Sequence, residues 1–169
     1  NSLFQSFLKI ADEVDPKNIV IENVAGMIRG KMKPVAAEII RALKDRGYQV
    51  TAGLIKAMYF GVPQQRPRVF FLASKNRKPV LPRPTHRFPV SAGKALEGVR
   101  DISGISVPDI TGEWRRLFID NAYPGEDGRQ YNQRTGGPEG FFNFWKMSPI
   151  KPSWTIPASV VLFHWDKRR

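Results

Sequence analysis

Glu22 lies at the end of a short apolar run, a place at which a carboxyl group can act on a bound ligand. Residues 18–24 read NIVIENV, so Glu22 and Asn23 close a segment whose composition fits a buried parallel strand. In open α/β sheets, ligands bind at the carboxyl ends of the strands. A carboxyl group at such a site can hold or transfer a proton. The alternative is a strand-end glutamate that faces solvent or caps the next turn.

A second run alternates polar and basic residues. Residues 61–68 read GVPQQRPR and continue into VFFLA, so Gln64, Arg66 and Arg68 would project from one face of an extended segment. Guanidinium groups on that face could bind carbonyl oxygens or phosphates. The alternative is an exposed edge strand that its charges keep soluble. Because neighbouring strands lie about 5 Å apart, we expect Glu22, Arg66 and Arg68 to converge at one edge of a sheet.

Two stretches have the apolar spacing of amphipathic helices, which would position these strands. The first covers residues 2–14 and begins with a capping box of Ser2 and Gln5. Its apolar residues at helical spacing are Leu3, Phe7, Ile10 and Val14. The second helix is opened by Pro34 and ended by Gly47. Its apolar face consists of Ala36, Ile39, Ile40 and Leu43.

Residues 48–57 and 69–73 are the further expected strands. The order helix, strand, helix, strand, strand predicts an α/β layer whose sheet is incomplete on its N-terminal side. From Lys78 the run KPVLPRPTHRFP is rich in proline and basic residues, which indicates a domain boundary.

We therefore expect one domain over residues 1–84 and a second over 85–169. The second has scattered glycine, proline and aromatic residues, and we expect it to be loop-rich and β-leaning. Residues 101–144 should be its least regular part, because glycines and prolines punctuate the stretch 123–140.

Composition favours a polyanionic partner and excludes some chemistry. There is no cysteine, so disulfides, thiolate metal sites and a cysteine nucleophile from this chain are excluded, and His86 and His164 alone predict no metal site. The net charge is +12, which predicts a polyanionic partner. No acidic residue occurs between Asp45 and Glu97, a gap that contains Arg46, Lys56, Arg66, Arg68, Lys75, Arg77, Lys78, Arg83, Arg87 and Lys94. The alternatives are a solvated basic face or an RNA-binding protein.

No apolar run is long enough to cross a membrane, and the first residues do not have the pattern of a signal peptide. The chain starts within an expected helix and without methionine, which suggests a coding sequence that begins upstream.

Taken together, these segments resemble the DNA cytosine-5 methyltransferase family. In that family a Glu-Asn-Val motif is followed, after a similar intervening sequence, by a Gln-x-Arg-x-Arg motif. Here ENV is followed by RGYQV and then by FGVPQQRPRVFFLA. The opening SLFQSFLKI is similar to the helix before the first motif, and LPRPTHRFPVSAGKALEGV to the entry of the target-recognition domain. KPSWTIPAS and FHWDKRR resemble that domain's exit. The resemblance is strong over 1–100 and moderate over 145–169, whereas 101–144 matches nothing, as expected of a region that encodes sequence choice.

The resemblance implies methyl transfer from S-adenosyl-L-methionine to carbon 5 of a cytosine that is flipped out of double-stranded DNA. It also implies a partial Rossmann-like methyltransferase sheet followed by a target-recognition region. Glu22 would neutralise charge at N3 of the base and bind its exocyclic amine, and Asn23 would brace the loop. Arg68 would bind the carbonyl oxygen of the base or an adjacent phosphate, and Arg66 would hold the active-site loop and Glu22.

The resemblance implies binding roles for further residues. Leu3 would lie beside the cofactor adenine, although a leucine on an amphipathic helix can simply be core. Thr155 would contact the backbone of the flipped nucleotide, with a core-strand threonine as the alternative, and Gln64 is a further candidate DNA-binding residue. Arg129 and Arg134, in the expected recognition region, should weaken DNA binding when replaced by alanine if they touch phosphate.

Three departures from the family pattern bear on activity. The family's glycine-rich cofactor loop and Pro-Cys loop should lie upstream of Asn1, its final cofactor-wall motif beyond Arg169, and Lys56 stands where asparagine is common. We therefore expect this chain alone to be inactive. Its partners would be DNA and the missing N-terminal and C-terminal portions of the enzyme, or a complementary subunit.

We expect a cytoplasmic, nucleoid-associated protein of bacterial or phage-like origin, of the kind found in restriction–modification. One alternative is a non-catalytic basic nucleic-acid-binding module, such as a decayed methyltransferase. Another is an RNA cytosine-5 methyltransferase, against which the recognition-domain-sized insert argues.

Overall fold

The computed structural model describes residues 2–99, 112–139, 144–156 and 161–163. The chain forms two compact units, of which the first is Asn1–Lys56 with Pro67–Arg83 and the second is Ala57–Arg66 with Pro84–Arg169. The first unit ends at Arg83, one residue before the end at residue 84 that the proline-rich run predicts. The loop 57–66 belongs to the second unit, so the run GVPQQRPR is divided between the two units.

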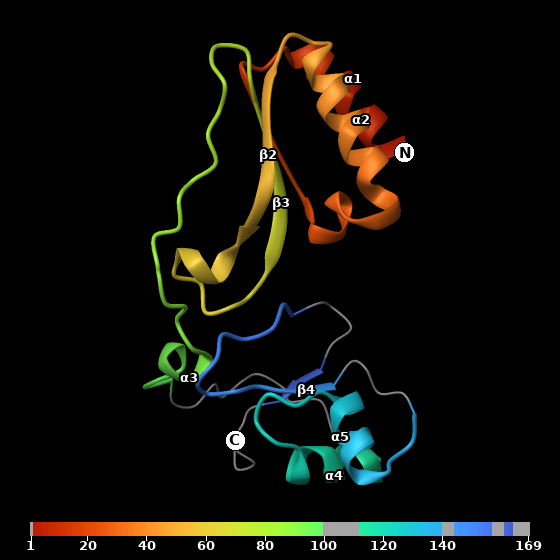
Figure 1. The fold of residues 1–169 in the computed structure, drawn as a ribbon, viewed down its shortest axis with the longest axis vertical. Coiled ribbons are helices and arrows are strands. Elements are labelled where there is room, and N and C mark those ends of the chain that lie inside the picture. The colour runs from red at the N-terminus through yellow and green to blue at the C-terminus, as the bar shows by residue number, and fades with distance from the viewer. Residues whose placement is uncertain (1, 100–111, 140–143, 157–160, 164–169) are drawn as a thin grey trace. The chain divides into compact units, whose positions relative to one another are not determined.

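A three-stranded antiparallel sheet forms the centre of the first unit (Figure 1). Its strands are β1 (Asn18–Val24), β2 (Gln49–Lys56) and β3 (Pro67–Ser74), in the order β1-β3-β2. The strands occur where the sequence predicts them. We expected β1 to be a parallel strand. This is wrong for β3, the neighbouring strand that the structure describes, because β3 pairs antiparallel with both β1 and β2. The parallel pair that a helical crossover would make, β1 and β2, is separated by the returning strand β3.

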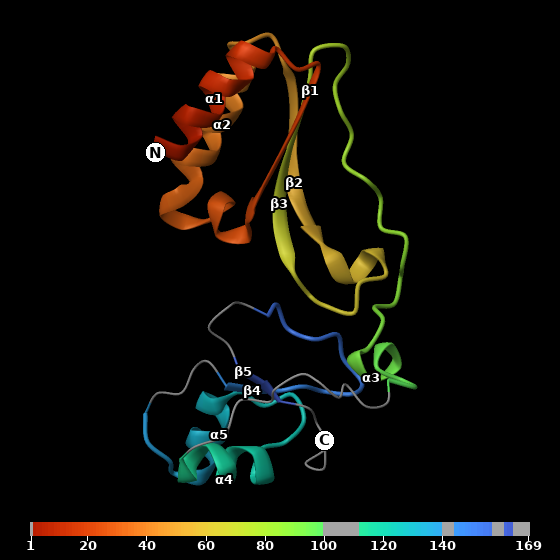
Figure 2. The same ribbon diagram turned by 180° about the vertical axis from the view of Figure 1, so that it is seen from behind.

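Two helices, α1 (Ser2–Val14) and α2 (Lys33–Lys44), cover one face of this sheet (Figures 1 and 2). The short 3-10 turns η1 (Ala25–Ile28) and η2 (Gly30–Met32) connect β1 to α2. The predicted apolar face of α2 is confirmed, since Ala36, Ile39 and Leu43 are buried and Ile40 packs against the same core. Gly47 follows the helix with φ +82°, a conformation that favours glycine.

Helix α1 has the predicted bounds but buries a different stripe. Phe4, Leu8 and Ala11 are buried in the core with the inner side chains of the sheet. Of the four residues predicted as its apolar stripe, Phe7 packs partly against the core, whereas Leu3, Ile10 and Val14 are exposed. The helix thus carries two adjacent apolar stripes, and helical spacing alone does not distinguish which of them faces the sheet.

The outer face of the sheet is covered unevenly. The segment that follows β3 returns along β2, where Thr51 donates from Oγ1 to the carbonyl oxygen of Pro79 at 2.6 Å and Leu81 lies against Gly53. Over β1 the outer side chains are open, and 66% of Val20 is exposed. The two edges of this sheet therefore differ in how well they are protected.

An aromatic cluster forms the core of the second unit. It joins α4 (Glu113–Asn121), α5 (Gly128–Thr135) and β4 (Phe144–Lys146), and its members are Trp114, Phe118, Tyr131 and Phe144. The same unit contains η3 (Ala57–Phe60), α3 (Ala92–Ala95) and β5 (Val161–Phe163), which pairs parallel with β4.

The described part of residues 101–144 is more helical than the sequence predicts. Asp127 and Gln130 form a capping box at the start of α5, and the indole nitrogen of Trp114 donates to Oδ1 of Asn132 at 2.7 Å. Two short helices interrupted by a turn replace the expected loops over 112–139, and no long continuous helix occurs in that stretch. Residues 100–111 and 140–143, which belong to the same expectation, lie outside the described residues.

Candidate functional site

Glu22 and Arg68 form an ion pair across neighbouring strands of the first unit. Glu22 lies opposite Phe70 and Val24 lies opposite Arg68, so both charged side chains are on the same face of the sheet. Arg68 Nε lies 2.8 Å from Glu22 Oε1, and the side chains are 18% and 43% exposed, respectively. The prediction that these two residues meet is confirmed.

The face that carries this pair is the one away from α1 and α2. Ile19 and Ile21 alternate with Glu22 along β1 and contribute to the core under the helices, so Glu22 points to the opposite side. Arg68 is further held because its Nη1 donates to the carbonyl oxygen of Pro67 at 2.9 Å. The pair therefore presents a partly exposed carboxylate with a fixed guanidinium beside it.

Asn23 acts at the end of β1. Its Oδ1 accepts a hydrogen bond from the backbone nitrogen of Val24 at 2.8 Å, directly before the chain turns into η1. The side chain thus stabilises the strand-to-turn step next to Glu22, which is a bracing contact of the kind expected from the sequence.

Arg66 breaks the expected alternation of Gln64, Arg66 and Arg68. Its φ is +21°, outside the extended region, so the segment does not continue as one strand through this residue. Arg66 and Gln64 belong to the second unit and Arg68 to the first. The convergence of Arg66 with the Glu22–Arg68 pair remains a prediction.

The loop that contains Gln64 pairs with the segment before Thr155 inside the second unit. Gln64 and Ser153 form a parallel bridge, in which Gln65 N donates to Ser153 O and Ser153 N donates to Pro63 O, each at 2.9 Å. Two candidate DNA-binding residues that are 91 positions apart in sequence, Gln64 and Thr155, therefore lie on paired segments. Backbone pairing of this kind has no signal in side-chain periodicity.

Leu3 is on the outer stripe of α1, and 83% of its surface is exposed. Leu3 is therefore not part of the core that the described residues form. An exposed leucine is of a type that can pack against a flat apolar ring such as adenine.

Arg134 has partners within its own unit, which sequence reasoning missed. Its guanidinium forms an ion pair with Glu126 and a cation–π contact with the ring of Tyr123. The helix that carries Arg134, α5, begins with a capping box. Burial raises the pKa of the Glu126 carboxyl, but hydrogen bonds from Arg134 and from the Tyr123 backbone amide outweigh burial and hold that pKa below its ordinary value. Arg129, by contrast, is exposed on α5.

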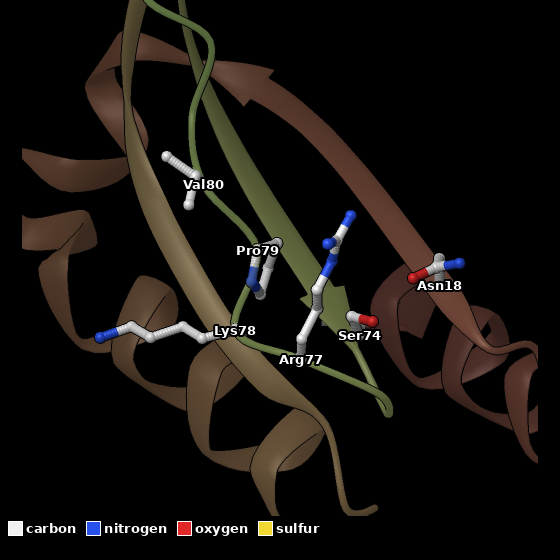
Figure 3. A pocket seen from close by; sticks show the side chains of 6 residues that line it. All are labelled: Asn18, Ser74, Arg77, Lys78, Pro79 and Val80. Carbon is white, nitrogen blue, oxygen red and sulfur yellow. The ribbon is translucent and has the colours of Figure 1, made fainter.

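A depression of about 500 Å³ lies at the Asn18 end of the sheet, far along β1 from Glu22 (Figure 3). Asn18, Ser74, Arg77, Lys78, Pro79 and Val80 line it. Arg77 extends along the sheet surface, whereas Lys78 points away from the other lining side chains. We assign no ligand to this basic depression.

Among the described residues there is no cluster of side chains that could hold a metal ion. None of the helices in the described ranges is long and apolar enough to span a bilayer.

Comparison with known proteins assigns this chain to a family. The family model for C-5 cytosine-specific DNA methylases matches residues 1–137. The chain therefore belongs to the C-5 cytosine-specific DNA methylase family.

Two relatives and one solved structure illustrate the likeness. The type II methyltransferase M.SacI of Streptomyces achromogenes is 28% identical over 98% of this chain and 48% of its own length. M.XorII of Xanthomonas oryzae pv. oryzae is 31% identical over 73% of this chain and 28% of its own. A putative DNA modification methyltransferase encoded within an E. coli prophage shares the fold, with 18% identity, 91% of this chain and 56% of that chain covered, and a TM-score of 0.56. The chain thus spans about half the length of M.SacI and less of M.XorII.

Proposed function

We propose that this chain is the part of a DNA cytosine-5 methyltransferase that holds the flipped cytosine, and that Glu22 and Arg68 bind the base. The observation that carries the proposal is their ion pair, in which Arg68 Nε lies 2.8 Å from a carboxylate that remains 43% exposed. Family membership supplies the class of reaction. The pair supplies a proton-transfer group whose position is fixed by a neighbouring strand.

Carbon 5 of cytosine is a weak nucleophile, so the reaction proceeds by addition of a thiolate to carbon 6. That thiolate comes from outside the 169 residues, which contain no cysteine. Glu22 takes up a proton when the base binds. As the thiolate adds, electron density moves through the ring to N3, and the protonated Glu22 donates that proton there. The second carboxyl oxygen of Glu22 accepts a hydrogen bond from the exocyclic amine, which selects cytosine over thymine. Arg68 binds the carbonyl oxygen of the base or a neighbouring phosphate.

The other site residues act around this pair. Asn23 keeps the strand end in place, Arg66 holds the active-site loop, and Gln64 and Thr155 contact the DNA backbone beside the flipped nucleotide. S-adenosyl-L-methionine supplies the methyl group in this chemistry. Leu3 fits one wall of its adenine site because it is apolar and exposed. The described residues form no enclosed cradle around Leu3, so the rest of that site comes from elsewhere in the enzyme.

Double-stranded DNA is the proposed substrate, in keeping with a net charge of +12. Activity requires the remaining portions of the enzyme or a complementary subunit, because the nucleophile is not in this chain. Bacterial relatives that are type II methyltransferases support a role in restriction–modification. We also propose that the protein is cytoplasmic and acts at the nucleoid, where its DNA substrate lies.

Replacement of Glu22 by glutamine tests the proposal in an enzyme that contains this chain and the nucleophile. Glutamine keeps the shape and can still touch the base but cannot donate a carboxyl proton, so single-turnover methyl transfer should fall by about 10²–10⁴. DNA binding, measured by titration, should change little. Glu38→Gln is the matched control, since Glu38 is an exposed carboxylate on α2.

Near-normal turnover of the Glu22→Gln enzyme would remove Glu22 from the mechanism. DNA binding without any methyl transfer by the unaltered enzyme would indicate a non-catalytic nucleic-acid-binding module instead.

A further inference from the structure

The loop 57–66, which carries Gln64 and Arg66, is closed at its base. Ala57 N donates to Arg66 O at 3.3 Å, so the two ends of the loop lie side by side. On one side the loop pairs with Ser153 through the bridge at Gln64. Compact surface loops whose ends meet frequently carry function. The placement of the loop's side chains therefore depends on the contacts that hold its backbone.

The proline-rich segment that leads to α3 holds the loop at a second place. Thr85 N and His86 N both donate to the carbonyl oxygen of Tyr59, each at 3.0 Å. Tyr59 is part of η3, the first turn of the loop. Figure 2 shows this turn, after β2, next to the segment that leads to α3. The run KPVLPRPTHRFP, which marks a domain boundary in the sequence, thus fixes the beginning of the loop.

The imidazole of His86 packs against the backbone of the same loop. Thr85 Oγ1 lies 2.9 Å from His86 Nδ1, and this contact sets the orientation of the ring. A Cβ added to Gly61 would lie 2.9 Å from His86 Cε1, so the ring approaches the loop where no side chain intervenes. Gly61 has φ +81°, a conformation that glycine adopts readily. His86 therefore holds the loop through its backbone amide and through its ring.

Arg66 has a backbone that needs support from its surroundings. Its φ of +21° is unfavourable for a residue that has a side chain. Such conformations persist when the surrounding structure holds them, and they cluster at functional sites. The contacts of the loop with Ser153, Thr85 and His86 supply that support within the second unit.

We propose that His86, together with Thr85, is a positioning residue of the methyltransferase, which holds the loop 57–66 in the conformation that Gln64 and Arg66 require. The proposal rests on the proposed function, in which these two residues contact the DNA backbone and the active-site loop. A misplacement of about 1 Å caused by a distant substitution can lower a rate by about 10²-fold. His86 thus affects methyl transfer through the loop, without contact with the base.

The surroundings of His86 favour this role over metal binding or proton transfer. Within the described ranges, no cluster of side chains that could hold a metal ion includes His86. One of its ring nitrogens already contacts Thr85 of its own segment. The carbon between the ring nitrogens, Cε1, is the atom that faces Gly61. Packing against the loop is therefore the interaction that the ring provides.

A spin label measures the mobility of the loop in the full chain. The chain contains no cysteine, so one introduced cysteine can carry a nitroxide. Val62→Cys places the label in the loop, and Leu117→Cys places it on α4 of the same unit as a control, since both side chains are partly exposed. In the His86→Ala chain, the rotational correlation time of the label should shorten about twofold at position 62 and stay unchanged at position 117. Phe88→Ala, which removes an exposed ring from the same segment, should change neither.

A double-mutant cycle tests the contact between the imidazole and the loop. Gly61→Ala should lower the denaturant midpoint of the unaltered chain more than that of the His86→Ala chain, because the added Cβ then no longer meets the ring. The strain of the left-handed backbone remains in both chains. Additive shifts of the midpoint would show that ring and loop are not in contact, and they would overturn the proposal.

The functional part of the test uses an enzyme that contains this chain and the nucleophile. His86→Ala should lower the single-turnover rate of methyl transfer by about 10- to 100-fold. The dissociation constant for DNA should rise by a smaller factor, because the basic residues that attract phosphate are intact. Phe88→Ala should leave both values unchanged.

Three results would overturn the positioning role. They are an unchanged label at position 62, an equal gain of mobility at positions 62 and 117, and a normal rate of methyl transfer in the His86→Ala enzyme. The two proposals fail separately. Methyl transfer that depends on His86 but survives Glu22→Gln contradicts the proposed function alone. Methyl transfer that depends on Glu22 but survives His86→Ala contradicts the positioning role alone.

Discussion

Arg134 and Glu126 form a bidentate ion pair in the second unit. Arg134 Nε lies 3.0 Å from Glu126 Oε1, and Arg134 Nη2 lies 2.9 Å from Oε2. The same Nη2 donates to the carbonyl oxygen of Asn121 at 3.1 Å, so one guanidinium connects the end of α4 to α5. Sequence alone suggested a phosphate contact for this arginine, whereas its hydrogen bonds indicate a structural role.

Arg134→Ala should therefore destabilise the second unit. Glu126 has a side chain that is only 10% exposed, and the substitution leaves its carboxylate without its main partner. We expect the thermal unfolding midpoint of the full chain to fall by about 2–5 °C, monitored by tryptophan fluorescence. Arg129→Ala, on the exposed side of α5, is the control and should change the midpoint by less than about 1 °C. Equal midpoints for the two variants would contradict the structural role of Arg134.

The same ion pair predicts acid sensitivity. Because the pKa of Glu126 is lower in the folded protein than in the unfolded chain, the carboxylate contributes stability above its unfolded pKa. That contribution is lost as the pH falls through the folded value, below the ordinary range of about 4.3. Unfolding by denaturant at several pH values should show a stability that falls in this window and a shallower fall in Glu126→Gln. A Glu126→Gln chain whose acid response matches that of the unaltered chain would rule the pair out as a source.

Arg129→Ala should affect DNA rather than stability. The side chain is exposed on α5, and no intramolecular ion pair of Arg129 occurs in the part of the chain that the structure describes. If it binds phosphate, the variant should bind DNA more weakly, and the slope of log affinity against log salt should decrease by about one. Gln133→Ala, on the same helix and uncharged, should leave the slope unchanged. An unchanged slope for Arg129→Ala would show that this arginine does not contact phosphate.

Gly61→Ala should disturb the loop that carries Gln64. Gly61 has φ +81°, and an added Cβ would meet Cε1 of His86 at 2.9 Å. The left-handed backbone alone costs a non-glycine residue about 1–2 kcal/mol, and displacement of the imidazole adds to that cost. Denaturant unfolding should show the loss in Gly61→Ala. Gly26→Ala, where a Cβ meets nothing within 4 Å, should be much closer to the unaltered chain.

Local sequence signals predicted the first unit well. Apolar spacing, Pro34 and Gly47 predicted α2 with its buried face, and the apolar run that ends in Glu22 and Asn23 predicted a carboxylate at the end of a strand. Glu22 lies near the end of one apolar strand and Arg68 near the start of another, and antiparallel pairing brings these two ends together.

Two features had no local signal, and for a third the local signals disagreed. The buried stripe of α1 depends on which side the sheet lies, because Phe4 and Leu8 are as apolar as Leu3 and Ile10. The antiparallel order depends on β3 returning between its predecessors, which is a property of topology. In the second unit, Asp127 and Gln130 have the sequence pattern of a capping box. The glycine and proline residues around them favoured loops, and the scattered aromatic residues gave only a weak indication of a core.

The strand order also determines when the first unit can fold during synthesis. Strand β3 is the last of the three to be made, and both ladders of the sheet include it. Among the strands that the structure describes, β1 and β2 pair only with β3, so neither ladder can form until Pro67–Ser74 has left the ribosome. Until then, the apolar segment NIVIENV lacks its β3 partner on a growing chain, where incompletely paired strands are prone to aggregate. A nascent chain paused before residue 67 should therefore recruit chaperones, and one that has emerged beyond residue 74 should release them.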